Sequence, residues 1–135
     1  MKEITLPALI QNIDPITDFI NEQLEAVDCP IKAQYQIDIA IDELVGNVAQ
    51  YAYPSGVGEI TVRFEMLEAP RSVVITFIDR GTPYDPLKKA DPDVTLALDK
   101  RKIGGLGIFL VKKSMDDMTY EYKDGQNILK IQKNI

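Results

Sequence analysis

The stretch "EITVRFEMLEAPRSVVITFID" (59–79) decides the fold, because the spacing of apolar residues changes here from helical to strand-like. Residues 59–67 alternate between apolar and polar side chains, and residues 71–79 are rich in β-branched side chains. Both patterns are typical of β-strands. The short link "EAP" between them predicts a hairpin.

Two amphipathic helices are predicted before this hairpin. Apolar residues recur at intervals of three and four from Leu9 to Val27 and again from Ile31 to Ala52, which places them on one side of a helix. The turn "VDCP" separates the two patterns, and "YPSGVG" (53–58) ends the second. A short strand over 2–8 precedes them, with Pro7 suited to an edge position or a strand end.

The rest of the chain predicts a lid, a helix and a second hairpin. Residues 80–105 are rich in Pro, Asp and Lys, with a weak helical pattern at "DVTLALDK". Loops of this length are usually functional lids or disordered segments, and we expect a lid over roughly 82–103. "GGLGIFLVKKSM" (104–115) predicts a glycine turn and a helix, and two alternating segments then turn at Asp124 and Gly125. The order βααββ, lid, αββ predicts an α+β two-layer sandwich, with helices on one face of a largely antiparallel sheet.

Composition limits the class of protein. The 135 residues are 45% hydrophobic and 27% charged, as expected for one soluble domain spanning 1–135. No apolar run approaches the roughly 18 residues of a membrane span, and the N-terminus lacks a signal-peptide core, so we expect a cytoplasmic protein without a membrane partner. The net charge of −6 argues against direct binding of nucleic acid.

The absence of histidine excludes several chemistries. A phospho-accepting histidine, a Ser-His-Asp triad within this chain and the usual histidine-bearing zinc sites all require that residue. The lone Cys29 cannot form an internal disulfide. With no histidine to activate it, we favour an inert thiol over a nucleophile.

Polar residues that could bind a ligand or take part in a reaction occur in three places. In "DELVGNVAQYAY" (42–53), Glu43 and Asn47 are four residues apart and therefore project from the same side of the helix. They can converge on one ligand, although a solvated polar face is the simpler interpretation of these two residues taken alone. In "FIDRGTPYDP", Asp79 ends an apolar strand just before Gly81 and Pro83. Its carboxylate can accept a hydrogen bond from an exocyclic amino group such as that of adenine, or it can be an ordinary turn aspartate.

The third place is "KRKIGGLGI" (100–108). Gly104, Gly105 and Gly107 allow a ligand to approach the backbone closely, and the helix that follows presents unpaired N–H groups to phosphate oxygens. The basic run 100–102, which includes Arg101, adds positive charge. Packing glycines and a solvated basic run are the simpler alternatives. The spacing fits neither a P-loop nor a Rossmann fingerprint.

Together, in this order, the three motifs resemble those of the histidine-kinase-like ATPase (GHKL) superfamily. Glu43 and Asn47 are similar to its N box, "DRGTP" to its first glycine box and "GGLGIFLVKKSMD" (104–116) to its second. The small size and "DRGTPYDP" are most similar to the bacterial anti-sigma-factor serine kinases. The resemblance implies a Bergerat-type ATP-binding fold and the cofactors ATP and Mg²⁺.

The resemblance also implies roles for individual residues. Glu43 would be the general base and Asn47 the Mg²⁺ ligand. Asp79, with Gly81 and Pro83 beside it, would recognise adenine. Asn127, which stands where many members have a threonine that faces the base, would also bind the nucleotide through a hydrogen bond. The phosphates would be wrapped by Gly104, Gly105, Leu106, Gly107 and Ile108, with Arg101 of the lid approaching the terminal phosphate. Tyr51 stands where many members have a histidine.

The leading hypothesis is an ATP- and Mg²⁺-dependent protein serine/threonine kinase acting as an anti-sigma factor. It would bind a sigma factor and phosphorylate a small anti-sigma-factor antagonist protein. One alternative is a non-catalytic ATP-binding regulatory module whose nucleotide state controls partner binding. A metabolic ATPase and a domain with chance motifs are the others. Family members often dimerise, so a homodimer is a further expectation.

Overall fold

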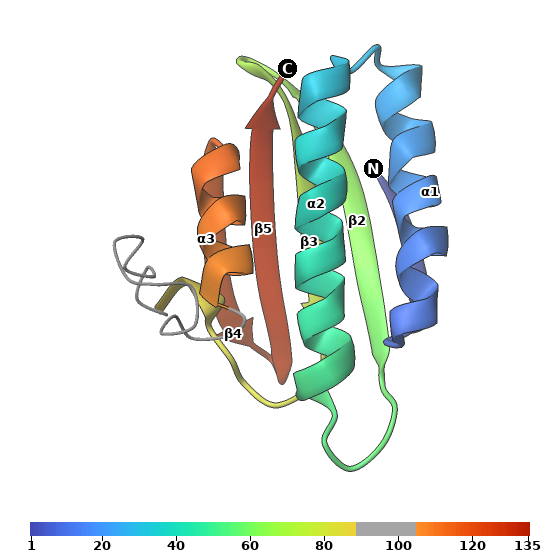
Figure 1. Ribbon diagram of the computed structural model, residues 1–135, viewed down its shortest axis with the longest axis vertical. Helices are drawn as coiled ribbons and strands as arrows, with labels where there is room; N and C mark the ends of the chain where they lie inside the picture. The colour runs from blue at the N-terminus through green and yellow to red at the C-terminus, as the bar shows by residue number, and fades with distance from the viewer. Residues whose placement is uncertain (89–104) are drawn as a thin grey trace.

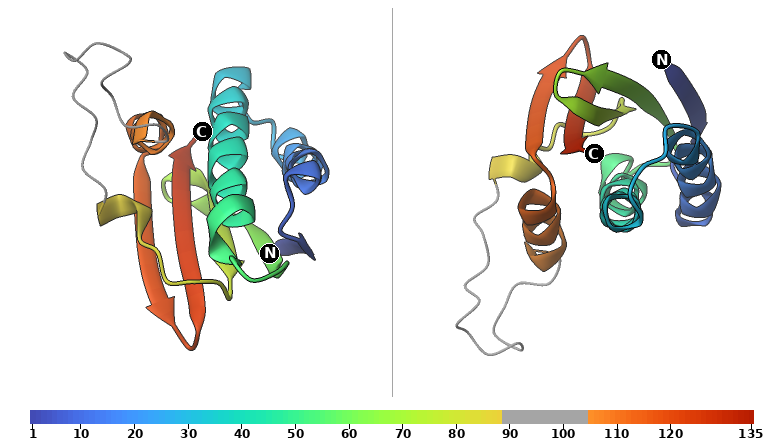
Figure 2. Two further views of the ribbon diagram at one scale, coloured as in Figure 1. Left: turned by 60° about the horizontal axis from the view of Figure 1, so that its bottom comes forward. Right: turned by 90° about the horizontal axis from the view of Figure 1, so that it is seen from above.

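The computed structural model describes residues 1–88 and 105–135 and consists of two layers. One layer is a five-stranded sheet in the order β1-β2-β3-β5-β4, in which every neighbouring pair is antiparallel. The other layer contains α1, α2 and α3, which all lie on the same face of the sheet (Figure 1). The view from above separates the two layers clearly (Figure 2). The predicted α+β sandwich is therefore confirmed.

The strands follow the alternating segments of the sequence. They are β1 (Lys2–Pro7), β2 (Glu59–Glu68), β3 (Arg71–Asp79), β4 (Asp117–Lys123) and β5 (Gln126–Asn134). Both predicted hairpins are confirmed. Asp124 and Gly125 turn the second hairpin with positive φ angles of 54° and 75°, a conformation that asparagine, aspartate and glycine tolerate best. Pro7 ends the edge strand β1, where its missing N–H removes no needed ladder bond.

The helices differ from the prediction at two ends. They are α1 (Ile13–Ala26), α2 (Ile31–Asn47) and α3 (Gly105–Ser114), with 3₁₀ turns η1 (Ile10–Asn12) and η3 (Pro86–Lys88) and a π-helical turn η2 (Val48–Ala52). The first helix was expected from Leu9, but the α-helix begins at Ile13. This start keeps Pro15 in the first turn, whereas a start at Leu9 would put it in the interior, where its ring clashes with a preceding carbonyl.

The second helix was expected to continue to Ala52, but its α-helical hydrogen bonding ends at Asn47 and the π-helical turn η2 follows. Such turns change the direction of the side chains that follow and are frequent at functional sites. The weak helical pattern at "DVTLALDK" lies outside the described residues. In the described part of the chain, no helix is long and apolar enough to cross a membrane.

The core lies between the sheet and the helices. In register across β2, β3 and β5, Val62, Phe77 and Leu129 form one buried row, and Phe64, Ile75 and Ile131 form the next. Ile16, Ile20 and Leu24 of α1 and Ile37, Ile41 and Leu44 of α2 cover these rows. The following row is Ile60, Asp79 and Asn127, all buried. The helix-covered face of the sheet therefore becomes polar at this end.

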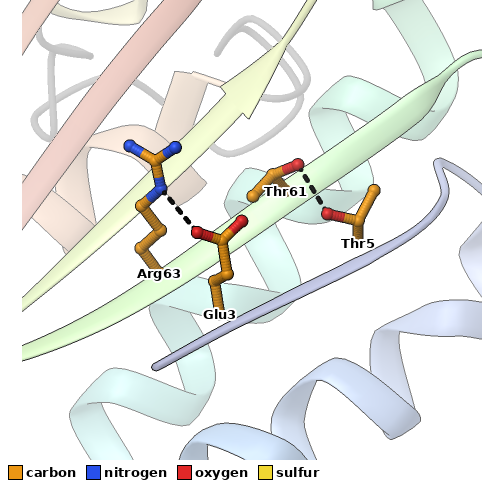
Figure 3. A network of polar contacts seen from close by, with 4 residues as sticks. All are labelled: Glu3, Thr5, Thr61 and Arg63. Atoms are coloured by element: carbon orange, nitrogen blue, oxygen red, sulfur yellow. Dashed lines mark hydrogen bonds and ion pairs between the residues drawn. The ribbon is translucent and has the colours of Figure 1, made fainter. Parts of the chain in front are cut away.

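Among residues 1–88 and 105–135, no helix covers the opposite face of the sheet, as the view from above shows (Figure 2). Two cross-strand pairs between β1 and β2 show its polar character (Figure 3): the Arg63 Nε atom lies 3.3 Å from the Glu3 Oε1 atom, and the hydroxyls of Thr5 and Thr61 are 2.8 Å apart. The side chains of Arg63 and Glu3 are 40% and 44% exposed, so solvent screens the pair and it contributes little to stability. One buried and one solvated face is the usual arrangement of an antiparallel sheet.

Candidate functional site

A cavity of about 180 Å³ lies between the end of α2 and the polar end of the sheet. Its walls come from α2 and η2, from β3, β4 and β5, and from the segment after β3: Leu44, Asn47, Val48, Tyr51, Ala52, Phe77, Asp79, Thr82, Pro83, Tyr84, Pro86, Tyr120, Asn127 and Leu129. Four residues predicted from the sequence therefore meet here, namely Asn47, Asp79, Pro83 and Asn127. The lining is mainly apolar with a few convergent polar groups, as in small-molecule sites. Ligand pockets usually exceed roughly 300 Å³, so this cavity suits a heterocycle rather than a whole nucleotide.

Asp79 reaches the cavity because of strand alternation. Asp79 points to the same face of the sheet as Phe77 and Ile75, which is the face that the helices cover. It is 6% exposed, and its Oδ1 atom accepts hydrogen bonds of 2.9 Å from the Gly81 N–H and from the Asn127 Nδ2 atom. Burial raises the pKa of this carboxyl, and the hydrogen bonds from Asn127 and Gly81 partly oppose the rise.

The segment after β3 is fixed against the end of the second helix. The Thr82 N–H donates to the Ala52 carbonyl at 2.8 Å, and Gly81 packs so tightly on Ala52 that a β-carbon there would overlap its backbone. The Tyr53 hydroxyl accepts a 2.9 Å bond from the Arg80 N–H and donates a 2.6 Å bond to the Glu59 carbonyl. Sequence reasoning assigned Ala52 and Tyr53 only to the helix and its end. The repeated aromatic and small residues of "YAY" were the available signal.

Glu43 lies at the contact between α2 and α3 and does not line the cavity. A β-carbon on Gly107 would overlap the Glu43 carboxylate group, so the glycine is what allows this close approach. Gly107 is the third residue of α3, in the turn whose N–H groups lack intrahelical partners. The Glu43 carboxylate is therefore beside a helix N-terminus, which favours negative charge.

The remaining predicted residues fall into three groups. Gly81 lies at the cavity's edge and donates to Asp79, as described above. Gly105 and Gly107 are in the first turn of α3, and Ile108 is 2% exposed and packs in the core, so its side chain is not available to a ligand. Arg101, Gly104 and the side chain of Leu106 lie outside the described residues.

The part of the chain that the structure describes contains no group of three or more acidic or cysteine side chains that could hold a metal ion. Asn47 supplies one amide oxygen beside the cavity. Mg²⁺ commonly keeps several waters and takes one or two protein ligands together with substrate phosphates. The residues present therefore fit a Mg²⁺ ion that arrives with a nucleotide, and they do not fit a dedicated all-protein metal cage.

Three tyrosines complete the cavity, and sequence reasoning gave none of them a role there. Tyr51 and Tyr84 are 67% and 47% exposed and contribute to its lining. Tyr120 comes from β4 and donates a short hydrogen bond from its hydroxyl to the Asn127 Oδ1 atom. Burial raises the pKa of Tyr120. The exposed ring of Tyr51 offers a flat apolar surface to a ligand.

The part of the chain that contains α1 and α2 is strongly acidic. Residues 8–53, which contain α1 and α2, carry eight acidic residues and Lys32 as their one basic residue, a net charge of −7, whereas the whole chain carries −6. Asp14, Asp18, Glu22 and Glu25 are exposed on α1. On the solvent side of α2, Ile31, Tyr35 and Ile39 form an exposed apolar stripe, with 85%, 67% and 42% exposure.

Comparison with known proteins identifies relatives of this chain by sequence. The sequence model of the family described as "Histidine kinase-like ATPase domain" matches residues 6–133. The chain is 26% identical to the serine/threonine-protein kinase BtrW of Bordetella bronchiseptica over 98 residues, which are 73% of this chain and 68% of that protein. It is 32% identical to the serine-protein kinase RsbW of Bacillus cereus over 95 residues, or 67% of this chain. RsbW of Bacillus thuringiensis is 30% identical over the same length. The match spans 58% of the length of each of these RsbW proteins.

Proposed function

Because this chain belongs to the histidine kinase-like ATPase domain family, we propose that it is an ATP-dependent protein serine/threonine kinase that acts as an anti-sigma factor. It binds a sigma factor and phosphorylates a small antagonist protein on a hydroxyl group. The observation that carries the proposal is that Asp79 and Asn47 line one cavity, while Glu43, one turn before Asn47 on α2, lies against Gly107 in the first turn of α3. Relatives named as serine kinases support it.

Asp79 suits adenine better than guanine. Among the described residues, both hydrogen bonds that it accepts are on Oδ1, which leaves Oδ2 for a ligand. A carboxylate oxygen accepts from the exocyclic amino group of adenine, whereas guanine presents a carbonyl oxygen at the equivalent position. The apolar walls supplied by Leu44, Phe77 and Leu129 enclose a flat ring.

Asn47 and the first turn of α3 suit the phosphates. Asn47 lines the cavity one helical turn after Glu43 on α2, and its amide oxygen would hold Mg²⁺. When bound, that ion neutralises charge on the phosphates. The unpaired N–H groups at the start of α3 would bind phosphate oxygens.

Glu43 would take the proton from the acceptor hydroxyl. As the hydroxyl oxygen forms its bond to the γ-phosphorus, the bond from that phosphorus to the ADP oxygen breaks and the proton passes to the carboxylate. A base positioned in this way contributes about 10²- to 10⁴-fold to the rate. Close packing against Gly107 restricts where the carboxylate can lie.

A phosphotransfer assay with the antagonist tests the proposal. Glu43→Gln should bind ATP as the wild type does but transfer phosphate about 10²- to 10⁴-fold more slowly. Asp42→Asn is the matched control, because Asp42 is the exposed neighbour on the same helix and undergoes the same acid-to-amide change. If Glu43→Gln transfers phosphate at the wild-type rate, Glu43 is not the base. If the wild type does not bind ATP in a calorimetric titration with Mg²⁺, the nucleotide assignment itself is wrong.

The acidic surface of α1 and α2 supports a sigma factor as the partner. A DNA-binding protein carries basic residues for the phosphate backbone, and these complement the net charge of −7 on residues 8–53. The apolar stripe of Ile31, Tyr35 and Ile39 would supply the apolar contact. Reversing charge at Asp18 and Glu22 should weaken capture of a sigma factor, whereas Glu121→Lys on the exposed strand β4 should not. Equal capture by both variants would place the interface elsewhere.

One observation favours a non-catalytic regulatory module as the second candidate. The Glu43 carboxylate is packed against Gly107 and is not on the cavity wall, so nucleotide could bind without bringing a hydroxyl to it. In that case ATP would change the affinity for a partner without phosphotransfer. Stoichiometric, ATP-dependent partner binding with no labelled product would select this function.

A further inference from the structure

One buried amide makes five hydrogen bonds at the polar end of the sheet. Asn127 is 6% exposed. Its Nδ2 atom donates to the Asp79 Oδ1 atom at 2.9 Å, to the Thr82 carbonyl at 3.1 Å and to the Gly81 carbonyl at 3.4 Å. Its Oδ1 atom accepts from the Tyr84 N–H at 3.1 Å and from the Tyr120 hydroxyl.

These bonds use the full capacity of the side chain. A primary amide has two N–H hydrogens and two carbonyl lone pairs, and here all of them face protein groups. The partners also fix which end is nitrogen, because three acceptors surround Nδ2 and two donors surround Oδ1. The direct contact with adenine expected for Asn127 would therefore require one of these bonds to break.

The partners belong to different parts of the fold. Asn127 on β5 is the cross-strand neighbour of Asp79 on β3, and Tyr120 reaches it from β4. Gly81, Thr82 and Tyr84 belong to the segment that follows β3, where the predicted lid begins. One side chain thus connects the adenine-facing carboxylate to the start of the lid.

We propose that Asn127 is a positioning residue that orients Asp79 toward the base and fixes residues 81–84 in the geometry that forms the cavity wall. With Oδ1 of Asp79 held by two donors, Oδ2 is directed to the ligand. The inference rests on the proposed function, since it assigns a role within the same nucleotide site. It replaces the sequence-based expectation that the Asn127 side chain touches adenine itself.

The first test exchanges the donor of Asn127 for an acceptor of the same size. Asn127→Asp keeps an acceptor for Tyr84 and Tyr120, but it removes the donor to Asp79 and places a second carboxyl beside it. We expect ATP to bind about 10-fold more weakly or worse. The acid limb of the pH profile of ATP binding should move to higher pH, because the second carboxylate disfavours ionisation of Asp79. The preference for ATP over GTP should fall. Asn134→Asp, the same change at an exposed position of β5, is the control and should change none of these.

The second test keeps the proposal falsifiable if Asn127→Asp does not fold. Tyr120→Phe removes one donor to Oδ1 and retains the ring, and should weaken ATP binding by about threefold to tenfold. Amide hydrogen exchange without nucleotide should be faster at Gly81 and Tyr84 in either folded variant. If the wild type fails to bind ATP, the proposed function is wrong. The exchange rates at Gly81 and Tyr84 still test whether Asn127 fixes residues 81–84. Folded variants with wild-type affinity, pH profile, base preference and exchange would overturn the inference.

Discussion

Replacing Gly107 by alanine should slow phosphotransfer without unfolding the protein. The added β-carbon would occupy the position of the Glu43 carboxylate, so one of the two groups must move. The group that it meets is the far end of a flexible side chain rather than backbone. Rotation of the Glu43 side chain therefore relieves the overlap with little cost to the fold.

The two effects of this substitution differ greatly in size. Alanine is favoured over glycine in a helix by up to about 1 kcal/mol, which offsets the strain of moving Glu43. We therefore expect the free energy of unfolding to change by less than about 1 kcal/mol, or a few degrees in Tm. Displacing a catalytic group by about 1 Å can cost on the order of 10²-fold in rate, so phosphate transfer should fall by at least that much.

Thermal unfolding, an ATP titration and a single-turnover transfer assay together measure these effects. Gly46→Ala is the matched control, because the nearest atom to a β-carbon there is the Ile13 Cδ1 atom at 4.0 Å. That variant should keep the wild-type rate and be equally or slightly more stable. A folded, ATP-binding Gly107→Ala protein with wild-type transfer would refute the reasoning that Gly107 holds the base in place.

Three further outcomes are expected at the other end of the site. Gly81→Ala should destabilise the protein by about 1–3 kcal/mol in chemical denaturation, because its β-carbon would meet the backbone of Ala52, which cannot rotate away; an unchanged midpoint would contradict this. Tyr53→Phe leaves a backbone donor and a backbone acceptor without their partner and should lower the free energy of unfolding by about 1–3 kcal/mol in chemical denaturation. An unchanged free energy would contradict this and would mean that water replaces the hydroxyl. The pKa of Asp79 is raised on folding, mainly by burial, so its stabilising effect is complete below the unfolded pKa of about 3.9 and is lost as pH rises through the folded value. Asp79→Asn should remove that fall in stability and also abolish preferential binding of ATP, and an unchanged pH profile would argue against the assignment.

The fold was largely predictable because each element carries its own periodic pattern. Apolar spacing predicted α1 and α2, alternation predicted β2, β4 and β5, β-branched content predicted β3, and Asp124 with Gly125 predicted the last turn. The exceptions are places where backbone chemistry overrides periodicity. Pro15 delays the α-helical start of α1, and the π-helical turn after Asn47 interrupts a stripe that continues unchanged in the sequence.

Four residues of the cavity lining were predictable from the sequence, whereas the contacts among them were not. Asp79 could be expected to face a pocket because it ends an apolar strand, and the structure places it on the cavity. The saturation of the Asn127 amide depends on the pairing of β3 with β5 and on the path of residues 81–84, neither of which a pattern within one strand shows. Likewise, the contact of Glu43 with Gly107 arises only when α2 and α3 are packed together.

These contacts give the two ends of the site different responses to substitution. At the sheet end, Asp79 is buried and held by an amide that also fixes the neighbouring backbone, so a change there should affect stability and nucleotide affinity together. At the helix end, the Glu43 carboxylate packs against Gly107, and a change at this glycine can move the carboxylate while the fold relaxes around it. Loss of phosphotransfer with retained ATP binding should therefore be common among variants of the α2–α3 contact. It should be rare among variants of the row that contains Asp79 and Asn127.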